Sequence, residues 1–171
     1  MRTSYVITAS AARSRAPAGP LAHYGSLVVP RAAKPLVDSA LAYLRRDAVE
    51  RALIARVEHS RVRHRIVIDH HGDDSYAPGV HAIFWDPTSA MHTTHGGSQS
   101  PALGLGHELD HAAVGDAMFD MLAAIPDRRF DNLEERRVIL GSERHAAHAL
   151  HESARDDHRG RNYRVTSPTE R

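Results

Sequence analysis

Two histidines and a glutamate stand in the order H-E-x-x-H at His107, Glu108 and His111. Residues four apart lie about 40° from each other on a helix of roughly 3.6 residues per turn, so both imidazoles can reach one ion. This spacing is typical of zinc peptidases, in which the glutamate is the general base toward a water molecule. The same order can also arise by chance in a chain with 14 histidines. The surrounding sequence must therefore decide.

The stretch that carries the motif, residues 101–116, predicts a buried helix. Small and apolar residues flank the motif on both sides, as expected for a core helix beside an active site. Asp110 departs from the pattern, because zinc peptidases usually carry an uncharged residue inside the motif. An unpaired buried carboxylate is costly, so we expect Asp110 to be exposed, paired with an arginine or bound to a ligand histidine.

A zinc site needs a third protein ligand, and the chain has no cysteine, so His, Asp or Glu must supply it. The extended motif with a third histidine fails, because Val114 and Ala117 occupy its glycine and histidine positions. Glu134 and Glu135 follow 23 and 24 residues after the second histidine. We prefer Glu135, which leaves Glu134 or Asp131 to cap the next helix or to orient a histidine.

Length and composition indicate one domain, because 171 residues with 42% apolar content suffice for a single core. The net charge of +1 gives no case for nucleic acid as a partner. No apolar run approaches the roughly 18–20 residues that cross a bilayer, and the N-terminus lacks the apolar core of a secretory signal. We expect a soluble chain whose partner is a protein or peptide and which has no membrane role. The sequence does not indicate its oligomeric state.

The first 35 residues are rich in Ser, Ala, Arg and Pro and precede the first acidic residue, Asp38. They predict a flexible N-terminal segment, either a secretion signal or an ordinary flexible end with a short strand at residues 4–8. Residues 36–171 then form the folded domain.

Apolar spacing in that domain predicts a long amphipathic helix over residues 36–58 and strands over 61–69 and 80–86. The strand at 80–86 is expected at the edge of the cleft, where an extended substrate can pair with it. A turn is expected at 70–79, where two histidines and two aspartates form a second metal site or merely decorate an exposed surface. Residues 87–99 predict a loop.

Beyond the motif, residues 131–157 predict another helix, and the tail after it predicts loop with a short strand near Tyr163. Three histidines recur every third residue on this helix, at His145, His148 and His151. They are either a metal-binding stripe or a polar face of the helix.

These residues together resemble the NleD-like effector metallopeptidases, which are zinc peptidases that bacteria deliver into host cells. The resemblance rests on LGHELDHA at residues 105–112, EERRVILG at 134–141 and RDDHRGRNYRVTSPT at 155–169. The strand sequence VHAIFWDP before the motif adds weaker support. The resemblance implies an α+β fold: a small zincin-like metallopeptidase domain with the H-E-x-x-H helix, a short mixed sheet and a downstream helix carrying a Glu ligand.

The pairing of HELxHA with a downstream EE-R also resembles the clostridial neurotoxin light chains. In those enzymes the second of two adjacent glutamates binds zinc, which implies Glu135 here. They also stabilise the oxyanion with an arginine and a tyrosine late in the chain. This implies Tyr163 with Arg159 or Arg161, although the spacing does not coincide.

We therefore expect a zinc-dependent endopeptidase in which Glu108 is the base and Tyr163 or a nearby arginine stabilises the oxyanion. The expected ligands of Zn²⁺ are His107, His111 and Glu135. The resemblance implies secretion by a bacterium into the host cytoplasm and cleavage of a host signalling protein. Two other readings stay open: an intracellular regulatory metallopeptidase of the bacterial cytoplasm, and a non-catalytic binding module on a peptidase scaffold, which Asp110 motivates.

Overall fold

The computed structural model describes residues 19–171, and residues 1–18 lie outside the described part. The short strand expected at residues 4–8 falls on those residues, as does half of the expected N-terminal segment. The expected domain start at residue 36 is wrong, because residues 21–30 form two strands whose Leu27 and Val29 are fully buried in the core. Among residues 19–171, no helix is both long and apolar enough to cross a membrane.

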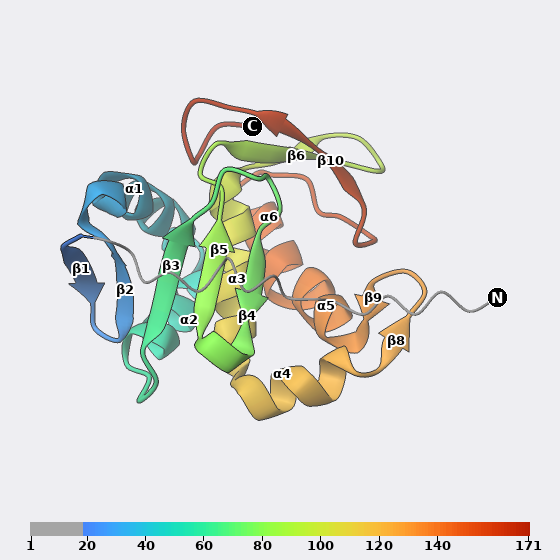
Figure 1. Ribbon diagram of the computed structural model, residues 1–171. Coiled ribbons are helices and arrows are strands. Elements are labelled where there is room, and N and C mark those ends of the chain that lie inside the picture. The colour runs from blue at the N-terminus through green and yellow to red at the C-terminus, as the bar shows by residue number, and fades with distance from the viewer. Residues whose placement is uncertain (1–18) are drawn as a thin grey trace.

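A five-stranded mixed sheet forms one layer of the fold, in the order β1-β2-β3-β5-β4 (Figure 1). Strands β2, β3 and β5 run parallel, and the two edge strands, β1 and β4, are antiparallel to their neighbours. The fold is therefore α+β with a mixed sheet, as expected. The strands are β1 Leu21–Tyr24, β2 Leu27–Pro30, β3 His64–Ile68, β4 Ser75–Ala77 and β5 Ala82–Trp85.

The sequence placed the wrong strand at the edge of this sheet. The strand expected at residues 80–86 is present as β5, but it lies between β3 and β4. All four of its residues are buried, which suits an interior strand. The edge strand is β4, which lies inside the segment expected to be a turn. It is only three residues long, and its pairing with β5 rather than its own sequence defines it.

Three helices pack together on one side of the sheet (Figure 1). They are α1 Lys34–Leu44, α2 Ala48–Glu58 and α3 Pro101–Val114. The single helix expected over residues 36–58 is wrong, because the chain breaks at Asp47. The Asp47 carboxylate accepts a hydrogen bond of 2.9 Å from the backbone N–H of Glu50 and so caps a new helix.

Helix α3 is the centre of the fold and confirms the helix expected around the motif. The side chain of Ser100 caps its first turn, and Pro101 follows at a position where a missing N–H costs nothing. The indole of Trp85 donates a 2.8 Å hydrogen bond to the Pro101 carbonyl, which ties the helix to β5. Gly115, at φ 85°, ends the helix in a conformation that favours glycine.

Helix α4 follows α3 at its C-terminal end, and α5 and α6 lie beside α3 (Figure 1). A small sheet in the order β10-β6-β7 covers the N-terminal end of α3, so the expected loop at 87–99 contains two strands, and the expected tail strand is confirmed. The helix expected over 131–157 instead ends at residue 149. The remaining elements are η2 Arg31–Ala33, η3 Pro78–Val80, β6 Ser89–Thr93, β7 Ser98–Gln99, α4 Asp116–Ala123, β8 Pro126–Asp127, β9 Asp131–Asn132, α5 Leu133–Val138, the π-helical η4 Ile139–Glu143, α6 Arg144–Ala149 and β10 Gly160–Arg164.

One carboxyl group, that of Glu50, is fully buried between α2 and α3. Neither of its side-chain oxygens has a hydrogen-bond partner among the described residues. Gly106 makes room for it, because a Cβ at that position would lie 2.7 Å from Glu50 Oε2. Burial, together with the carboxylates of Asp110 and Asp47, raises the pKa of Glu50 to about 8.

We expect Glu50→Gln to stabilise the protein at pH 8 and to have little effect at pH 4. The folded pKa lies above the unfolded value, so the unfolded state holds fewer protons between these limits and wild-type stability falls as pH rises. The full loss is on the order of 3–5 kcal/mol above pH 8. Urea unfolding at both pH values measures it, with Glu58→Gln on the same helix as the control. An equal effect of Glu50→Gln at both pH values would contradict the prediction.

Candidate metal centre

Three side chains converge on one point beside α3. The Nε2 atoms of His107 and His111 face each other at 2.9 Å. The two carboxylate oxygens of Glu135 lie 3.0 Å from His107 Nε2 and 3.3 Å from His111 Nε2. Ligand atoms about 2.0–2.1 Å from a tetrahedral ion stand about 3.3 Å apart, so this spacing fits the surroundings of a single metal ion.

Both histidines are held by carboxylates on their other ring nitrogen. Glu143 lies 2.7 Å from Nδ1 of His107, and Glu134 lies 2.9 Å from Nδ1 of His111. A carboxylate only accepts hydrogen bonds, so each Nδ1 carries a proton and each Nε2 faces the shared point, where a bound metal would need its lone pair. The orienting role that was left open between Glu134 and Asp131 belongs to Glu134. Asn132 caps α5 instead, accepting from the Glu135 N–H at 3.0 Å.

A distortion of the helix after Glu135 brings the second orienting carboxylate into place. Glu134 and Glu143 are nine residues apart (143 − 134 = 9), and at about 100° per residue they would face opposite sides of a regular helix. The π-helical turn and the non-helical backbone of Gly141 change this phase. Both glutamates therefore face α3. A sequence pattern of regular helical period does not reveal this arrangement.

The charges of the cluster depend on one another. Burial alone would lower the pKa of His107, but Glu135 and Glu143 raise it to about 10. Burial alone would raise the pKa of Glu135, but hydrogen bonds with His107, His111 and His158 hold it well below its usual range. In the metal-free protein, protons on His107 and His111 supply the positive charge that neutralises Glu135. A metal ion bound at Nε2 would displace protons from these two rings.

A buried arginine completes the support behind His107. Arg155 is 8% exposed, and its guanidinium donates hydrogen bonds of 2.8 and 2.7 Å to the two oxygens of Glu143. The side-chain amide of Gln99 donates a further bond of 2.9 Å to Glu143. Burial alone would raise the pKa of Glu143, but Arg155 and His107 hold it well below its usual range. Glu143 therefore remains a charged acceptor for His107.

Asp110 is buried and paired, which is one of the arrangements expected for it. Its carboxylate accepts a 2.8 Å hydrogen bond from Nη1 of Arg137 and another from the hydroxyl of Ser142. Arg137 also binds both oxygens of Glu134, at 2.9 and 2.7 Å. Asp110 thus anchors the arginine that fixes Glu134, and through it His111. The departure from the usual motif has a structural function.

Glu108 lies at the wall of a cavity of about 270 Å³ that His107 also lines. Its carboxylate is 4.0 Å from His107 Nε2 and is buried. Burial raises the pKa of Glu108, against the opposing effect of the two histidines. A carboxylate of raised pKa that lies beside candidate metal ligands and an open cavity can act as a general base. It can take a proton from a water molecule and later donate that proton to a leaving group.

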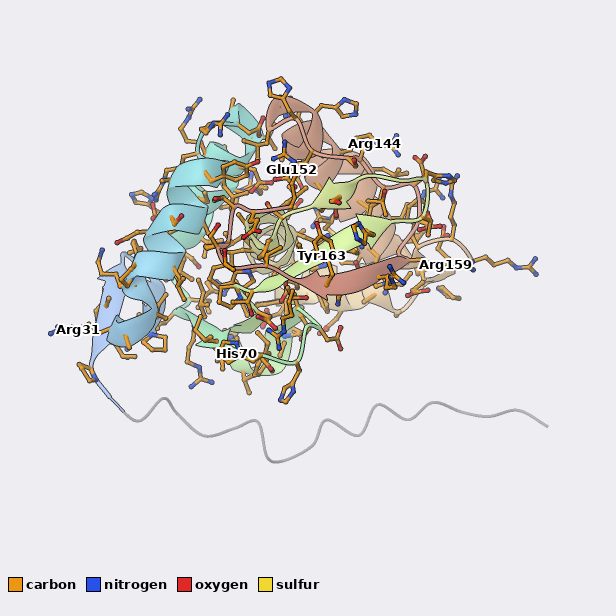
Figure 2. All side chains as sticks on the ribbon, turned by 90° about the horizontal axis from the view of Figure 1, so that it is seen from above. Arg31, His70, Arg144, Glu152, Arg159 and Tyr163 are labelled. Carbon is orange, nitrogen blue, oxygen red and sulfur yellow. The ribbon has the colours of Figure 1, made fainter. Side chains whose placement is uncertain are left out.

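Tyr163 does not lie at this cavity. Its ring stacks on that of His92, with centroids 4.0 Å apart, and its neighbour Asn162 on β10 lines the cavity instead. Because side chains alternate along a strand, the two point to opposite faces of the ribbon. Figure 2 shows Tyr163 near the middle of the molecule and Arg159 near its margin. Arg159 and Arg161 are both exposed. The structure does not bring the expected oxyanion group to the site.

The other histidine groups are separate from this centre. His145 lies 2.8 Å from Asp47, and His148 and His151 are exposed. In the segment at 70–79, His70 and His71 lie near two different carboxylates, at 3.6 and 3.5 Å. Within residues 19–171, the group whose ligand atoms lie close enough together to hold a metal ion is the buried group of His107, Glu108 and His111.

Sequence reasoning missed several contacts of the site. Glu143 and Arg155 form the buried pair behind His107, and Asp131 and His158 form a second pair beside Glu135. Asp131 was considered only as a cap or as an orienting acid for a ligand. The one signal for Arg155 and His158 is their place in the tail segment that carries the family resemblance.

We expect wild-type protein to bind one equivalent of zinc, and His111→Ala and Glu135→Ala to lose it. Each substitution removes one of the three converging donor groups. Metal analysis of the purified proteins by mass spectrometry measures the stoichiometry. His148→Ala removes an exposed histidine of α6 and should retain one equivalent. Wild-type protein that takes up no zinc on reconstitution would show that the cluster does not hold this metal.

Comparison with known proteins adds no family to this description, since no family model, curated protein or solved structure matches the chain. The function has to be argued from the site itself. What the site establishes is a buried His-Glu-His group that could hold a metal ion, beside an open polar cavity.

Proposed function

We propose that the chain is a zinc-dependent endopeptidase with a zincin-like domain. The observation that carries the proposal is the convergence of His107, His111 and Glu135 on one point, with Glu108 beside them at the cavity wall. Two imidazoles and one carboxylate are a ligand set of catalytic zinc, and the cavity reaches the group at His107. A structural zinc site would instead be closed by a fourth protein ligand.

The proposed chemistry assigns a separate task to each residue. A bound zinc ion would polarise the scissile carbonyl and lower the pKa of a water molecule toward about 7. Glu108 accepts the proton of the attacking water and later donates it to the leaving nitrogen. Glu134 and Glu143 keep both imidazoles in the tautomer that presents Nε2.

The sheet supports a peptide as the substrate. Strand β4 ends the sheet, and Asp73 and Asp74, which immediately precede it, line the cavity. An extended peptide can add to such an edge through main-chain hydrogen bonds while its scissile bond lies beside Glu108. This gives β4 the substrate-pairing role that the sequence had suggested for the next strand along the chain.

Asp110 was the reason for considering a non-catalytic binding module, and its contacts remove that reason. Asp110 raised doubt about activity as a charged residue inside the motif, but it pairs with Arg137 and Ser142 and supports His111 through Glu134. Its presence is therefore compatible with catalysis.

We expect Glu108→Gln to keep its zinc but to lose turnover by about 10²- to 10⁴-fold, because the amide cannot accept the proton of water. New peptide termini in a mixture of unstructured peptides, detected by mass spectrometry, measure turnover beside zinc content. Glu58→Gln, remote from the cavity on α2, serves as the matched control. Full activity in Glu108→Gln would rule out this residue as the base. A zinc-loaded but inactive wild type with a stable protein partner would favour the binding module.

The resemblance to NleD-like effector metallopeptidases extends the proposal to a bacterial effector that cleaves a host signalling protein. This part rests on the sequence resemblance alone. We expect residues 1–35, fused to a reporter enzyme, to direct export of the reporter into host cells in a bacterium with an effector secretion system. Retention of the fusion in the bacterial cytoplasm would favour the intracellular regulatory peptidase.

A further inference from the structure

Strand β10 is an edge strand of the small sheet. Within residues 19–171 it pairs with β6 alone, in the order β10-β6-β7. Four of its five residues are exposed, which suits an edge that no other segment covers. The free edge of a strand presents a row of backbone N–H and C=O groups that another chain can bind. Strand β10 therefore has the form of a site for an added strand.

The pairing with β6 shows which backbone groups of β10 point outward. Directly after the strand, the N–H of Val165 donates a 3.0 Å hydrogen bond to the carbonyl of Thr88. Along an antiparallel pair, residues that exchange such bonds alternate with residues that do not. Every second residue counted back from Val165 thus faces β6. The residues whose backbone groups point away from β6 are Gly160, Asn162 and Arg164.

This free edge lies beside the cavity of the candidate metal centre. Gly160 and Asn162 line that cavity together with His107 and Glu108. Side chains alternate along a strand, so Arg161 projects from the opposite face of the ribbon. A peptide added to β10 would place every second side chain on the cavity side and the others on the side of Arg161.

The segments at this edge carry an excess of positive charge. The backbone N–H of His158 donates a 3.1 Å hydrogen bond to the carbonyl of Arg129, which joins the β8–β9 hairpin to the start of β10. Two aspartates lie here, since Asp131 contacts His158 and Asp157 accepts from the Arg159 N–H. The exposed arginines of the two segments, none of which forms an ion pair with another described residue, are Arg128, Arg129, Arg159 and Arg161.

We propose that β10 binds an extended, acidic segment of the protein substrate as an added strand. A peptide has both donors and acceptors in its backbone and so matches the outward groups of β10. The arginines select carboxylates on the side chains that lie on their face of the ribbon. The inference rests on the proposed peptidase function, because it names the class of substrate. It adds a second edge to the one at β4 and concerns substrate residues outside the cleaved bond.

The test measures the binding of short fluorescent peptides to the full-length Glu108→Gln protein, in which turnover is suppressed. The probe is a capped peptide of alternating glutamate and threonine, whose carboxylates share one face when it is extended. A second peptide carries lysine in place of glutamate. Two further versions of the acidic peptide are N-methylated, one on every glutamate and the other on every threonine.

We expect the acidic peptide to bind at least about 10-fold more tightly than the lysine peptide, as read by fluorescence anisotropy. One N-methylated version should bind at least about 10-fold more weakly than the acidic peptide, and the other should keep its affinity. The reason is that only alternate N–H groups of an added strand face its neighbour. Equal affinity of the two methylated versions would overturn strand addition, whether both bind or both fail.

Arg161→Glu should weaken the acidic peptide by about three- to tenfold, and Arg159→Glu should do the same. Arg31→Glu is the matched control, because Arg31 is an exposed arginine at the opposite margin of the molecule from Arg159 (Figure 2). Equal weakening by Arg31→Glu would show an effect of overall charge and would overturn the site at β10.

Asn162→Pro removes an outward N–H at an edge position that tolerates proline, and should weaken the acidic peptide by about 10-fold. Asn162→Ala also loses the side-chain hydrogen bond to the Gly72 carbonyl but keeps the backbone N–H. Its affinity should stay within about twofold of the unsubstituted value. Equal weakening by the two substitutions would contradict main-chain pairing.

These measurements are separate from those that test the peptidase. Zinc uptake and the loss of turnover in Glu108→Gln decide the proposed function whatever β10 binds. A wild type that takes up zinc and cuts peptides, with no preference for the acidic probe, would overturn this inference alone. The expected binding pattern in a protein that takes up no zinc would support a binding surface at β10 and overturn the proposed function.

Discussion

The structure depends on burying charged side chains around a single helix. Helix α3 lies inside the core, yet it carries two histidines, a glutamate and an aspartate that are all at most 6% exposed. Each such group is costly to bury unless it finds a partner of opposite charge or a hydrogen bond. Asp110 pairs with Arg137, and the two histidines pair with glutamates that Arg137 and Arg155 bind in turn. The segments that carry them are thereby fixed against α3.

This requirement explains the irregular second half of the chain. A straight helix after Glu135 would turn Glu143 away from His107, and the distortion at Gly141 prevents this. The loop that follows α6 must then return to bring Arg155 beneath Glu143 and His158 beside Glu135. The irregular backbone between α5 and β10 therefore places these charged side chains next to the histidines of α3.

The proposed function rests on the cavity that reaches the cluster at His107 and Glu108. On the side away from Nε2, the Nδ1 atoms of His107 and His111 each lie against a carboxylate. The cavity is lined by His107 and Glu108, and it extends to Asp73 and Asp74 next to the edge strand β4. Imidazoles held in place beside an accessible cavity would suit the proposed metal-dependent hydrolase, because its ligands must stay fixed while substrate and water exchange.

The sequence by itself predicted the motif helix, singled out His107, His111 and Glu135 as candidate ligands, and limited the arrangements open to Asp110. It could do so because helical spacing is a local property, and because few residue types bind zinc in a chain without cysteine. Only the tertiary structure decided that β4 rather than β5 forms the sheet edge, that Tyr163 faces away from the cavity, and that His158 borders the site. Those outcomes depend on strand order and on backbone distortion, which bring together residues far apart in the chain.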